Sequence, residues 1–285
     1  MPALPAQWPH ALPFLAQRVI DRGVDLPNPY DVGVSVYLGR EDRKLRSLNI
    51  GLNGGTPVDA SFVQFPNSRV EPISLQVQAG AWVLPFLNVY AIGGYTHGTG
   101  DIDIVIPGAD LMNFLKVPGC QLPLALRPAL CSQTLSGTAH ANYDGSTYGV
   151  GMTAAGAKGN FFGALPITYV ISDLSISDTR GRTWNIAPRL GYNQRYSNTG
   201  MLTWYVGGTY LISDMDITGS FVFDTSNTVI GKPTTLSYSI HVEPKNPWNY
   251  LAGVNWTISR KWSVVAETGF GSSRSDILLT SFYRW

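Results

Sequence analysis

The chain has 285 residues, of which only 14% are charged, and its formal net charge at neutral pH is +1. Soluble domains usually hold about 25% charged residues, so this composition is unusual for one, and a balanced charge gives no field that would attract nucleic acid. The low charge and the 12% of aromatic residues argue against a disordered chain. No apolar run reaches the roughly 18 residues of a membrane-spanning helix, which excludes a helical bundle in a bilayer.

Residues 1–30 form a segment distinct from the domain expected over 31–285. Within it, residues 10–22 (HALPFLAQRVIDR) place Leu15, Val19 and Ile20 along one side of a short amphipathic helix. A glycine and two prolines follow and prevent the helix from continuing. We expect this helix to lie either on the surface, as a linker, or inside the following domain, as a plug.

From residue 31 onward the chain alternates apolar residues with polar ones or glycine, which is the period-two pattern of strands. In 73–83 the odd positions hold Ile, Leu, Val and Ala, and the even positions hold Ser, Gln, Gly and Trp. The second face is polar and glycine-rich rather than charged, which suits an enclosed wet interior. Twelve strands are predicted, at 31–39, 44–53, 57–66, 72–84, 86–100, 137–155, 160–175, 181–193, 200–218, 236–258, 261–271 and 276–285.

The predicted connections sort by length into two groups. On one side all are short, at 53–56, 84–86, 157–159, 196–199 and 259–260. On the other side most are longer, at 39–43, 66–71, 100–136, 175–181, 223–235 and 271–275. Many predicted strands reach the roughly 9–11 residues that a tilted transmembrane strand needs. We therefore predict an all-β fold, a transmembrane antiparallel up-and-down β-barrel of about 12 strands with a short N-terminal helix.

Two further patterns concern the ends of the strands. Aromatic residues gather near the short turns and the final strand end, as expected at a membrane interface: Phe86, Phe161, Phe162, Trp204, Trp256, Trp262, Tyr283 and Trp285. The last strand alternates and ends on an aromatic residue. It resembles the insertion signal of bacterial outer-membrane β-barrel proteins, in which the terminal residue is normally Phe.

This resemblance covers residues 31–285 as architecture and extends to the whole class, without pointing to one family. It implies a Gram-negative outer-membrane location, with the lipid bilayer and lipopolysaccharide as surroundings. It also implies that the barrel-assembly machinery recognises the C-terminal strand.

A barrel of this size is intermediate between filled eight-stranded barrels and open sixteen-stranded porins. The interior would be partly filled by Tyr, Trp and Arg side chains, so a narrow porin-like passage or a closed pocket is expected. Arg189, Lys261 and Glu267 lie at positions of their predicted strands that point into the lumen. They would either set the selectivity of a passage or form a network of ion pairs that packs the lumen.

Acidic residues recur where three strands run toward the side with long loops. They are Asp101 and Asp103, then Asp173, then Asp214 and Asp216. Residues two apart on a strand face the same way, so the members of each pair point together. Two such pairs that converge at the mouth of the barrel could bind a cation, attract a cationic solute or share a proton for hydrolysis. The alternative is that these side chains are simply solvated at an aqueous rim. No cofactor is expected, and whether a metal binds stays open.

Two histidines border the long loop and are the candidates for catalysis. His97 comes before Asp101 and Asp103, and His140 before Asp144. Outer-membrane phospholipases use a Ser–His–Asn arrangement and omptin proteases use acidic pairs with an Asp–His pair, but the spacing here reproduces neither motif. Whether the chain is an enzyme therefore stays undecided, and a non-enzymatic role is favoured.

Two features belong to the predicted outer loops. Cys120 and Cys131 are close in sequence and predict a disulfide, rather than a metal site. The disulfide would close either a compact outer flap or an inward-folded loop. A basic cluster, formed by Arg40, Arg43, Lys44 and Arg46, could bind lipopolysaccharide phosphates. The acidic residues among them favour an ordinary charged loop.

Three functions follow from these patterns. The first is passage or binding of a small solute through a narrow, partly plugged lumen. The second is an outer-membrane hydrolase, lipase-like or protease-like, with its site at the extracellular rim. The third is a surface protein that binds a partner through its outer loops.

Overall fold

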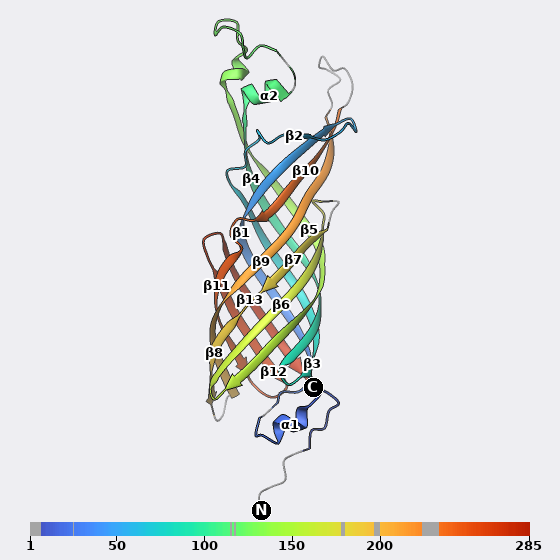
Figure 1. Cartoon of the computed structure of the whole chain (residues 1–285), viewed down its shortest axis with the longest axis vertical. Coiled ribbons are helices and arrows are strands. Elements are labelled where there is room, and N and C mark those ends of the chain that lie inside the picture. The colour runs from blue at the N-terminus through green and yellow to red at the C-terminus, as the bar shows by residue number, and fades with distance from the viewer. Residues whose placement is uncertain are drawn as a thin grey trace, which may run out of the picture.

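A computed structural model describes residues 7–24, 26–114, 116, 118–177, 180–196, 200–223 and 234–285. Antiparallel strands form a long cylinder, with α1 below one end and α2 at the far end (Figure 1). The strands are β1 (Tyr30–Leu52), β2 (Val58–Asp59), β3 (Ser68–Leu84), β4 (Leu87–Pro107), β5 (Thr134–Lys158), β6 (Phe161–Leu174), β7 (Gly181–Ile186), β8 (Arg189–Tyr196), β9 (Gly200–Phe223), β10 (Thr234–Pro244), β11 (Trp248–Thr257), β12 (Trp262–Phe270) and β13 (Arg274–Arg284). The helices are α1 (Ala16–Ile20), α2 (Gly108–Phe114) and a 3₁₀ turn (Ala129–Ser132).

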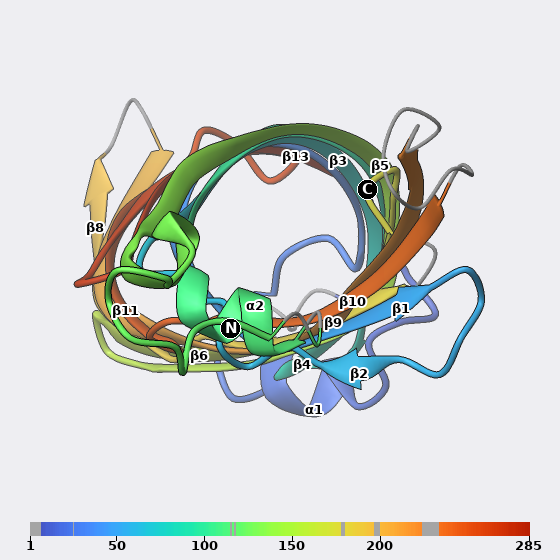
Figure 2. The same cartoon turned by 90° about the horizontal axis from the view of Figure 1, so that it is seen from above.

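Strand pairing closes the sheet into a ring, as the view from above shows (Figure 2). β1 pairs with β13 on one side and with β3 on the other, so the first and last strands of the barrel meet. β7 and β8 together occupy one position between β6 and β9, and β10 and β11 together occupy another. Counted around the ring, the described strands therefore fill ten places, and two of these places are each filled by two strands in succession. The prediction of an antiparallel up-and-down barrel is confirmed.

The sheet has 13 strands, close to the predicted number of about 12, but several strand boundaries differ from the prediction. Predicted strands 31–39 and 44–53 form one continuous strand, β1, and the predicted strand 57–66 contains only the two residues of β2. The charged run at 39–46 looks like a loop in sequence, but here β1 has risen above the apolar zone, and its outward side chains, Arg40 and Arg46, reach water. The basic cluster consequently lies on a strand, and not in a loop as predicted.

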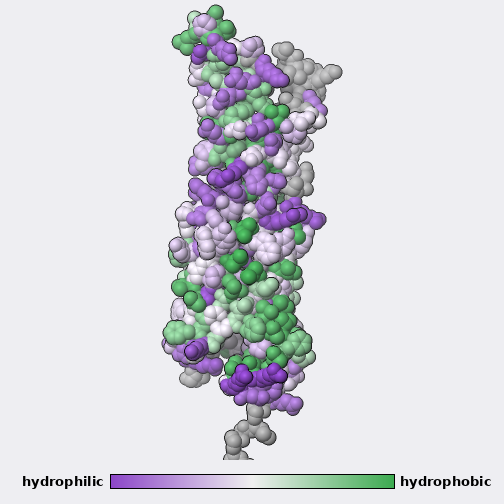
Figure 3. Space-filling model, in the orientation of Figure 1, coloured by the Kyte–Doolittle hydropathy of each residue, from purple (hydrophilic) through white to green (hydrophobic). Residues whose placement is uncertain are grey.

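The distribution of polarity is the reverse of that in a soluble protein. Large apolar side chains point outward and are exposed, among them Val34, Val36, Leu75, Val77, Val150, Met152, Val206, Val264 and Leu279. Most of the buried polar residues lie at positions of the ring strands that point inward, including Ser74, Thr96, Thr147, Asn249, Ser263 and Thr280. On the face shown in Figure 3, the hydrophobic areas concentrate in the lower half of the cylinder. Only a hydrocarbon environment makes such an exterior stable in a closed barrel.

The turns differ in length at the two ends of the cylinder. At the lower end the connections between β3 and β4 and between β5 and β6 have two residues each, whereas residues 108–133 connect β4 to β5 at the upper end. Aromatic rings gather near the lower end, with Trp262 and Tyr283 at 5.0 Å and Phe161 and Tyr192 at 5.4 Å between centroids. Short turns, long outer loops and an aromatic girdle are features of outer-membrane barrels.

The N-terminal segment lies below the lower end of the strands (Figure 1). The Phe14 N–H donates to the Val83 carbonyl at 3.0 Å, and the Trp82 N–H donates to the Pro29 carbonyl at 2.8 Å. Part of this segment passes beneath the bore, since it lies below the strands in Figure 1 and inside the ring in Figure 2. None of the described helices has the length and hydropathy needed to span a membrane.

Candidate functional site: the lumen and the outer surface

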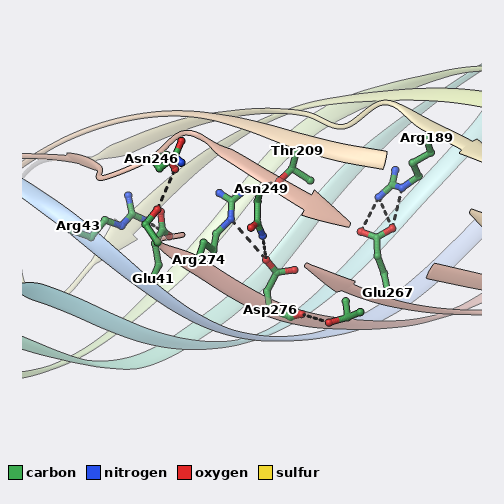
Figure 4. Close-up of polar contacts among 11 residues, drawn as sticks. Glu41, Arg43, Arg189, Thr209, Asn246, Asn249, Glu267, Arg274 and Asp276 are labelled. Atoms are coloured by element: carbon green, nitrogen blue, oxygen red, sulfur yellow. Dashed lines mark hydrogen bonds and ion pairs between the residues drawn. The ribbon is translucent and has the colours of Figure 1, made fainter. Parts of the chain in front are cut away.

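A bidentate ion pair crosses the lumen between β8 and β12 (Figure 4). Arg189 donates through Nε and Nη2 to the two carboxylate oxygens of Glu267, at 2.9 and 3.0 Å. The Tyr205 hydroxyl donates to the same carboxylate at 3.1 Å, and the Arg189 guanidinium lies over the Tyr205 ring at 5.8 Å. The Arg189 side chain is 19% exposed and that of Glu267 7%. These three side chains therefore obstruct the bore near its middle.

A second group of charged side chains lies nearer the upper end of the barrel (Figure 4). The Arg274 guanidinium lies 3.7 Å from the Asp276 carboxylate and also donates to the Thr209 hydroxyl. Asn249 donates its amide N–H to Asp276 at 3.1 Å. On β1, Arg43 and Glu41 form an ion pair at 2.9 Å. Every charge in this group thus has an oppositely charged neighbour.

Inward-facing tyrosine rings lie over glycines of neighbouring strands, which make room for them. A Cβ atom added to Gly151 would lie 2.4 Å from the Tyr90 ring, and one added to Gly253 would lie 2.5 Å from the Tyr205 ring. Such distances are far inside van der Waals contact. The glycines at inward-pointing positions therefore leave space on the inner wall for the rings of the lumenal tyrosines.

Seven buried oxygens on the inner wall have no hydrogen-bond partner within the part of the chain that the structure describes. They are Asp31 Oδ1, Glu41 Oε1, Thr147 Oγ1, Asn185 Oδ1, Asn249 Oδ1, Asn255 Oδ1 and Ser263 Oγ. Buried polar atoms almost always have a partner, and these belong to five different strands that face the interior of the barrel. The lumen is therefore a polar interior suited to water or to hydroxyl- and amide-bearing solutes.

The structure brings together two of the three residues predicted to face the lumen. Arg189 and Glu267 bind each other, whereas Lys261 lies exposed in the turn before β12. β11 ends at Thr257 and β12 begins at Trp262, so Lys261 belongs to the turn between them. The alternation of inward and outward side chains along β11 does not apply to a turn residue. Sequence reasoning missed Tyr205, Arg274 and Asp276, although each continues the inward phase of its strand.

The acidic residues predicted at the mouth do not converge there. On β4 the odd positions point outward, as the exposed Val89 and Tyr95 show. Asp101 therefore lies on the outer surface, where it accepts a hydrogen bond from His140 Nδ1 at 2.6 Å. Asp103 accepts from Asn67 and Thr138 at 3.0 and 2.8 Å, and these two donors lower the pKa of its carboxyl.

The other predicted site residues occupy the same outer zone. His97 Nδ1 lies 2.7 Å from Asp144, so both histidines face a carboxylate across the β4–β5 hairpin. Asp173 pairs with Arg180 at 2.9 Å. Asp214 and Asp216 lie beside His241, a residue that the sequence reasoning did not consider.

The basic cluster is divided between the two faces of β1. Arg40 points outward and pairs with Glu71 at 2.8 Å, and Arg46 pairs with Glu243 at 2.7 Å. Arg43 points inward to Glu41. Because each guanidinium already has its own carboxylate, these residues do not form a common phosphate-binding surface.

The predicted disulfide is present in the outer loop of residues 108–133. Cys120 and Cys131 have Cα atoms 5.4 Å apart and enclose a short loop at the far tip of the molecule. Three leucines in this loop are exposed, Leu122 at 45%, Leu124 at 80% and Leu126 at 70%. The loop thus presents a closed apolar tip well above the apolar zone of the barrel.

No family model and no curated protein matches the chain. Among solved structures, the β-domain of the Bordetella autotransporter BrkA has 10% identity and a TM-score of 0.41, with 92% of this chain and all of that chain covered. The translocator domain of the autotransporter NalP from Neisseria meningitidis has 13% identity and a TM-score of 0.34, covering 94% and 93%. The Pseudomonas putida toluene transporter TodX has 8% identity and a TM-score of 0.33, covering 90% and 88%.

Likenesses at these TM-scores carry no argument about this chain. Its class follows from the ring closure, the even number of ring positions, the apolar exterior and the unequal turns. These features together define an outer-membrane β-barrel, as the sequence predicts, and give the chain a bilayer environment.

Proposed function

We propose that this barrel forms a narrow, partly obstructed passage or binding site for a small, uncharged polar solute. The observation that carries the proposal is the set of seven buried, unpartnered oxygens that face one enclosed interior. A lumen whose only role was to pack the barrel would pair or exclude such atoms. A hydroxylated or amide-bearing solute would satisfy them one after another along the bore.

The balance of lumenal charge supports an uncharged solute over an ion. Four inward carboxylates, of Asp31, Glu41, Glu267 and Asp276, are matched by four guanidinium groups, of Arg43, Arg189, Arg274 and Arg284. A balanced interior gives a passing ion little net attraction. The acidic residues expected to attract cations at the mouth point away from it, so they add no selectivity there.

Planar-bilayer recordings and liposome swelling test this proposal together. We expect a small conductance with weak preference between anions and cations, and swelling in small uncharged sugars that declines with sugar size. Absence of any current together with absence of swelling would contradict a passage. Saturable sugar binding without swelling would identify a closed binding site.

A second candidate function rests on the disulfide-closed tip, for which we propose contact with an opposing lipid surface. Exposed apolar residues on a protruding loop favour insertion at a membrane interface. No acidic residue occurs between 111 and 143, whereas Lys116 and Arg127 lie in the loop. The local charge therefore favours an anionic lipid surface over a neutral one.

The double change Leu124→Ser and Leu126→Ser is expected to abolish binding to anionic vesicles. The barrel in nanodiscs would be floated with vesicles that contain phosphatidylserine, because the apolar tip supplies most of the binding energy. Leu135→Ser alters an exposed leucine of β5 in the same extension and should leave flotation unchanged. Equal flotation of the double variant and the unaltered chain would eliminate this function.

We also infer that lipopolysaccharide surrounds the outer half of the barrel and that the assembly machinery engages β13. The support for the second inference is that β13 alternates along its length and closes the ring against β1. The hydrolase alternative would use the two imidazole–carboxylate pairs of the outer surface, His97 with Asp144 and His140 with Asp101.

A further inference from the structure

Three potential metal ligands meet on the outer surface where β9 pairs with β10. Asp214 and Asp216 lie two residues apart on β9, so their carboxylates share one face. His241 of β10 is the direct cross-strand partner of Asp216. The ligand atoms of the three residues all lie within 4.8 Å of one another. We propose that Asp214, Asp216 and His241 bind a divalent transition-metal ion of the Zn²⁺ type.

The separations of the ligand atoms fit such an ion. His241 Nδ1 lies 2.9 Å from an oxygen of Asp216 and 3.7 Å from an oxygen of Asp214. Ligands on tetrahedral Zn²⁺ at bond lengths of about 2.0 Å lie roughly 3.3 Å apart. The two observed distances lie on either side of that value, and the oxygens of the two aspartates lie within 4.8 Å of each other.

The types of ligand also favour a transition metal over Ca²⁺ or Mg²⁺. Those harder ions prefer a shell of oxygens, whereas one imidazole with two carboxylates suits Zn²⁺ and its neighbours in the first transition row. The two backbone segments are fixed by the β9–β10 ladder, which holds the three side chains on one face before any ion arrives. Asp214 is 76% exposed, which gives an ion direct access and leaves a coordination position open to water.

Charged side chains of both signs surround this cluster. Glu243 also lies on β10 and is paired with Arg46 of β1, at 2.7 Å. Arg182 of β7 is the cross-strand neighbour of Asp214, and Lys44 of β1 is that of Glu243. The two aspartates are the carboxylates nearest to the imidazole, and a divalent cation bound between them would offset their charge.

The other two histidine–aspartate pairs of the outer surface are matched controls. His97 faces Asp144 alone among the described carboxylates within ion-pair distance, and His140 faces Asp101 in the same way. Asp103, the neighbour of Asp101, is held instead by Asn67 and Thr138. Only the cluster around His241 combines three ligands in the described part of the chain.

Titration of the untagged, refolded barrel in detergent with Zn²⁺, after treatment with a chelator, tests the proposal by calorimetry. We expect one ion per chain, and His241→Ala should weaken the affinity at least about tenfold. Asp214→Asn should weaken it as well, and this exposed position puts folding at little risk. His140→Ala should leave the affinity within about twofold of the unaltered chain, because it removes no ligand.

Folding of each variant would be checked by its heat-modifiable mobility on gels. Absence of binding at millimolar Zn²⁺ would overturn the proposal. So would binding that survives both His241→Ala and Asp214→Asn, or binding that His140→Ala removes equally. The measurement is independent of the proposed passage, since the cluster lies outside the barrel and a closed lumen would not alter the result.

Discussion

Replacing Val150 with arginine should destabilise the barrel in a lipid bilayer by about 2–4 kcal/mol. Val150 lies on β5 with its side chain 60% exposed on the outer face, and its cross-strand partners are Ala91 and Tyr169. A guanidinium at this point would enter the hydrocarbon, where it has neither water nor a carboxylate to bind. In a soluble protein the same change at an exposed strand position would have an effect near zero.

Urea unfolding of the barrel in phospholipid vesicles, followed by tryptophan fluorescence, would measure this effect. Thr99→Arg is the matched control, because Thr99 is exposed on the outer face of β4 above the apolar zone. It should change the free energy of unfolding by less than about 0.5 kcal/mol. If the two variants unfolded at the same urea concentration, the placement of the bilayer around the lower half of the cylinder would be wrong.

Removal of one lumenal charge should change ion selectivity more than any other single substitution. Glu267→Gln leaves the Arg189 guanidinium without its bidentate partner in the middle of the bore. A unit charge about 4 Å from a passing ion contributes about 4 kcal/mol at an effective dielectric constant of 20. The permeability ratio of chloride to potassium should therefore rise at least about tenfold, since about 1.4 kcal/mol corresponds to a factor of ten.

The double variant Arg189→Ala with Glu267→Ala separates charge from bulk. It keeps the lumen balanced and removes two obstructing side chains, so conductance should rise while selectivity returns to that of the unaltered chain. Arg40→Ala with Glu71→Ala removes an ion pair of the outer surface and should change neither quantity. Reversal potentials in a potassium chloride gradient give the ratio. An unchanged ratio in Glu267→Gln would show that ions do not pass this ion pair.

The sequence contains the information that these acidic side chains point outward. To find it, the alternation of inward and outward positions must be followed along the whole strand. Val89 and Tyr95 occupy odd positions of β4 and face lipid, so Asp101 and Asp103 at odd positions had to face outward too. The local pattern of each acidic pair predicts a place at the mouth, because it does not include the direction in which the rest of the strand points its side chains. The contact between His241 and Asp216 could not be found in this way, because it depends on the register of β9 against β10.

The strand boundaries show a different limit of sequence reasoning. Polarity predicts a loop within the charged run at 39–46 and a strand at 57–66. Polarity, however, also changes along a single strand where that strand passes from hydrocarbon into water. β1 continues through this boundary because its backbone groups pair with β3 and β13 below and with β10 above. Continuity of pairing, and not residue composition, decided where the strand ends.

The sequence alone determined the class of fold, because period-two alternation in segments of this length leaves one apolar face that only lipid can cover. It also determined that the interior is polar and that Arg189 and Glu267 belong there, since side-chain phase is a local property of a strand. The tertiary structure decided the ring of ten positions, the pairing of each lumenal charge and the meeting of Asp214, Asp216 and His241. These depend on the register between strands, which is set by hydrogen bonds between segments far apart in the chain.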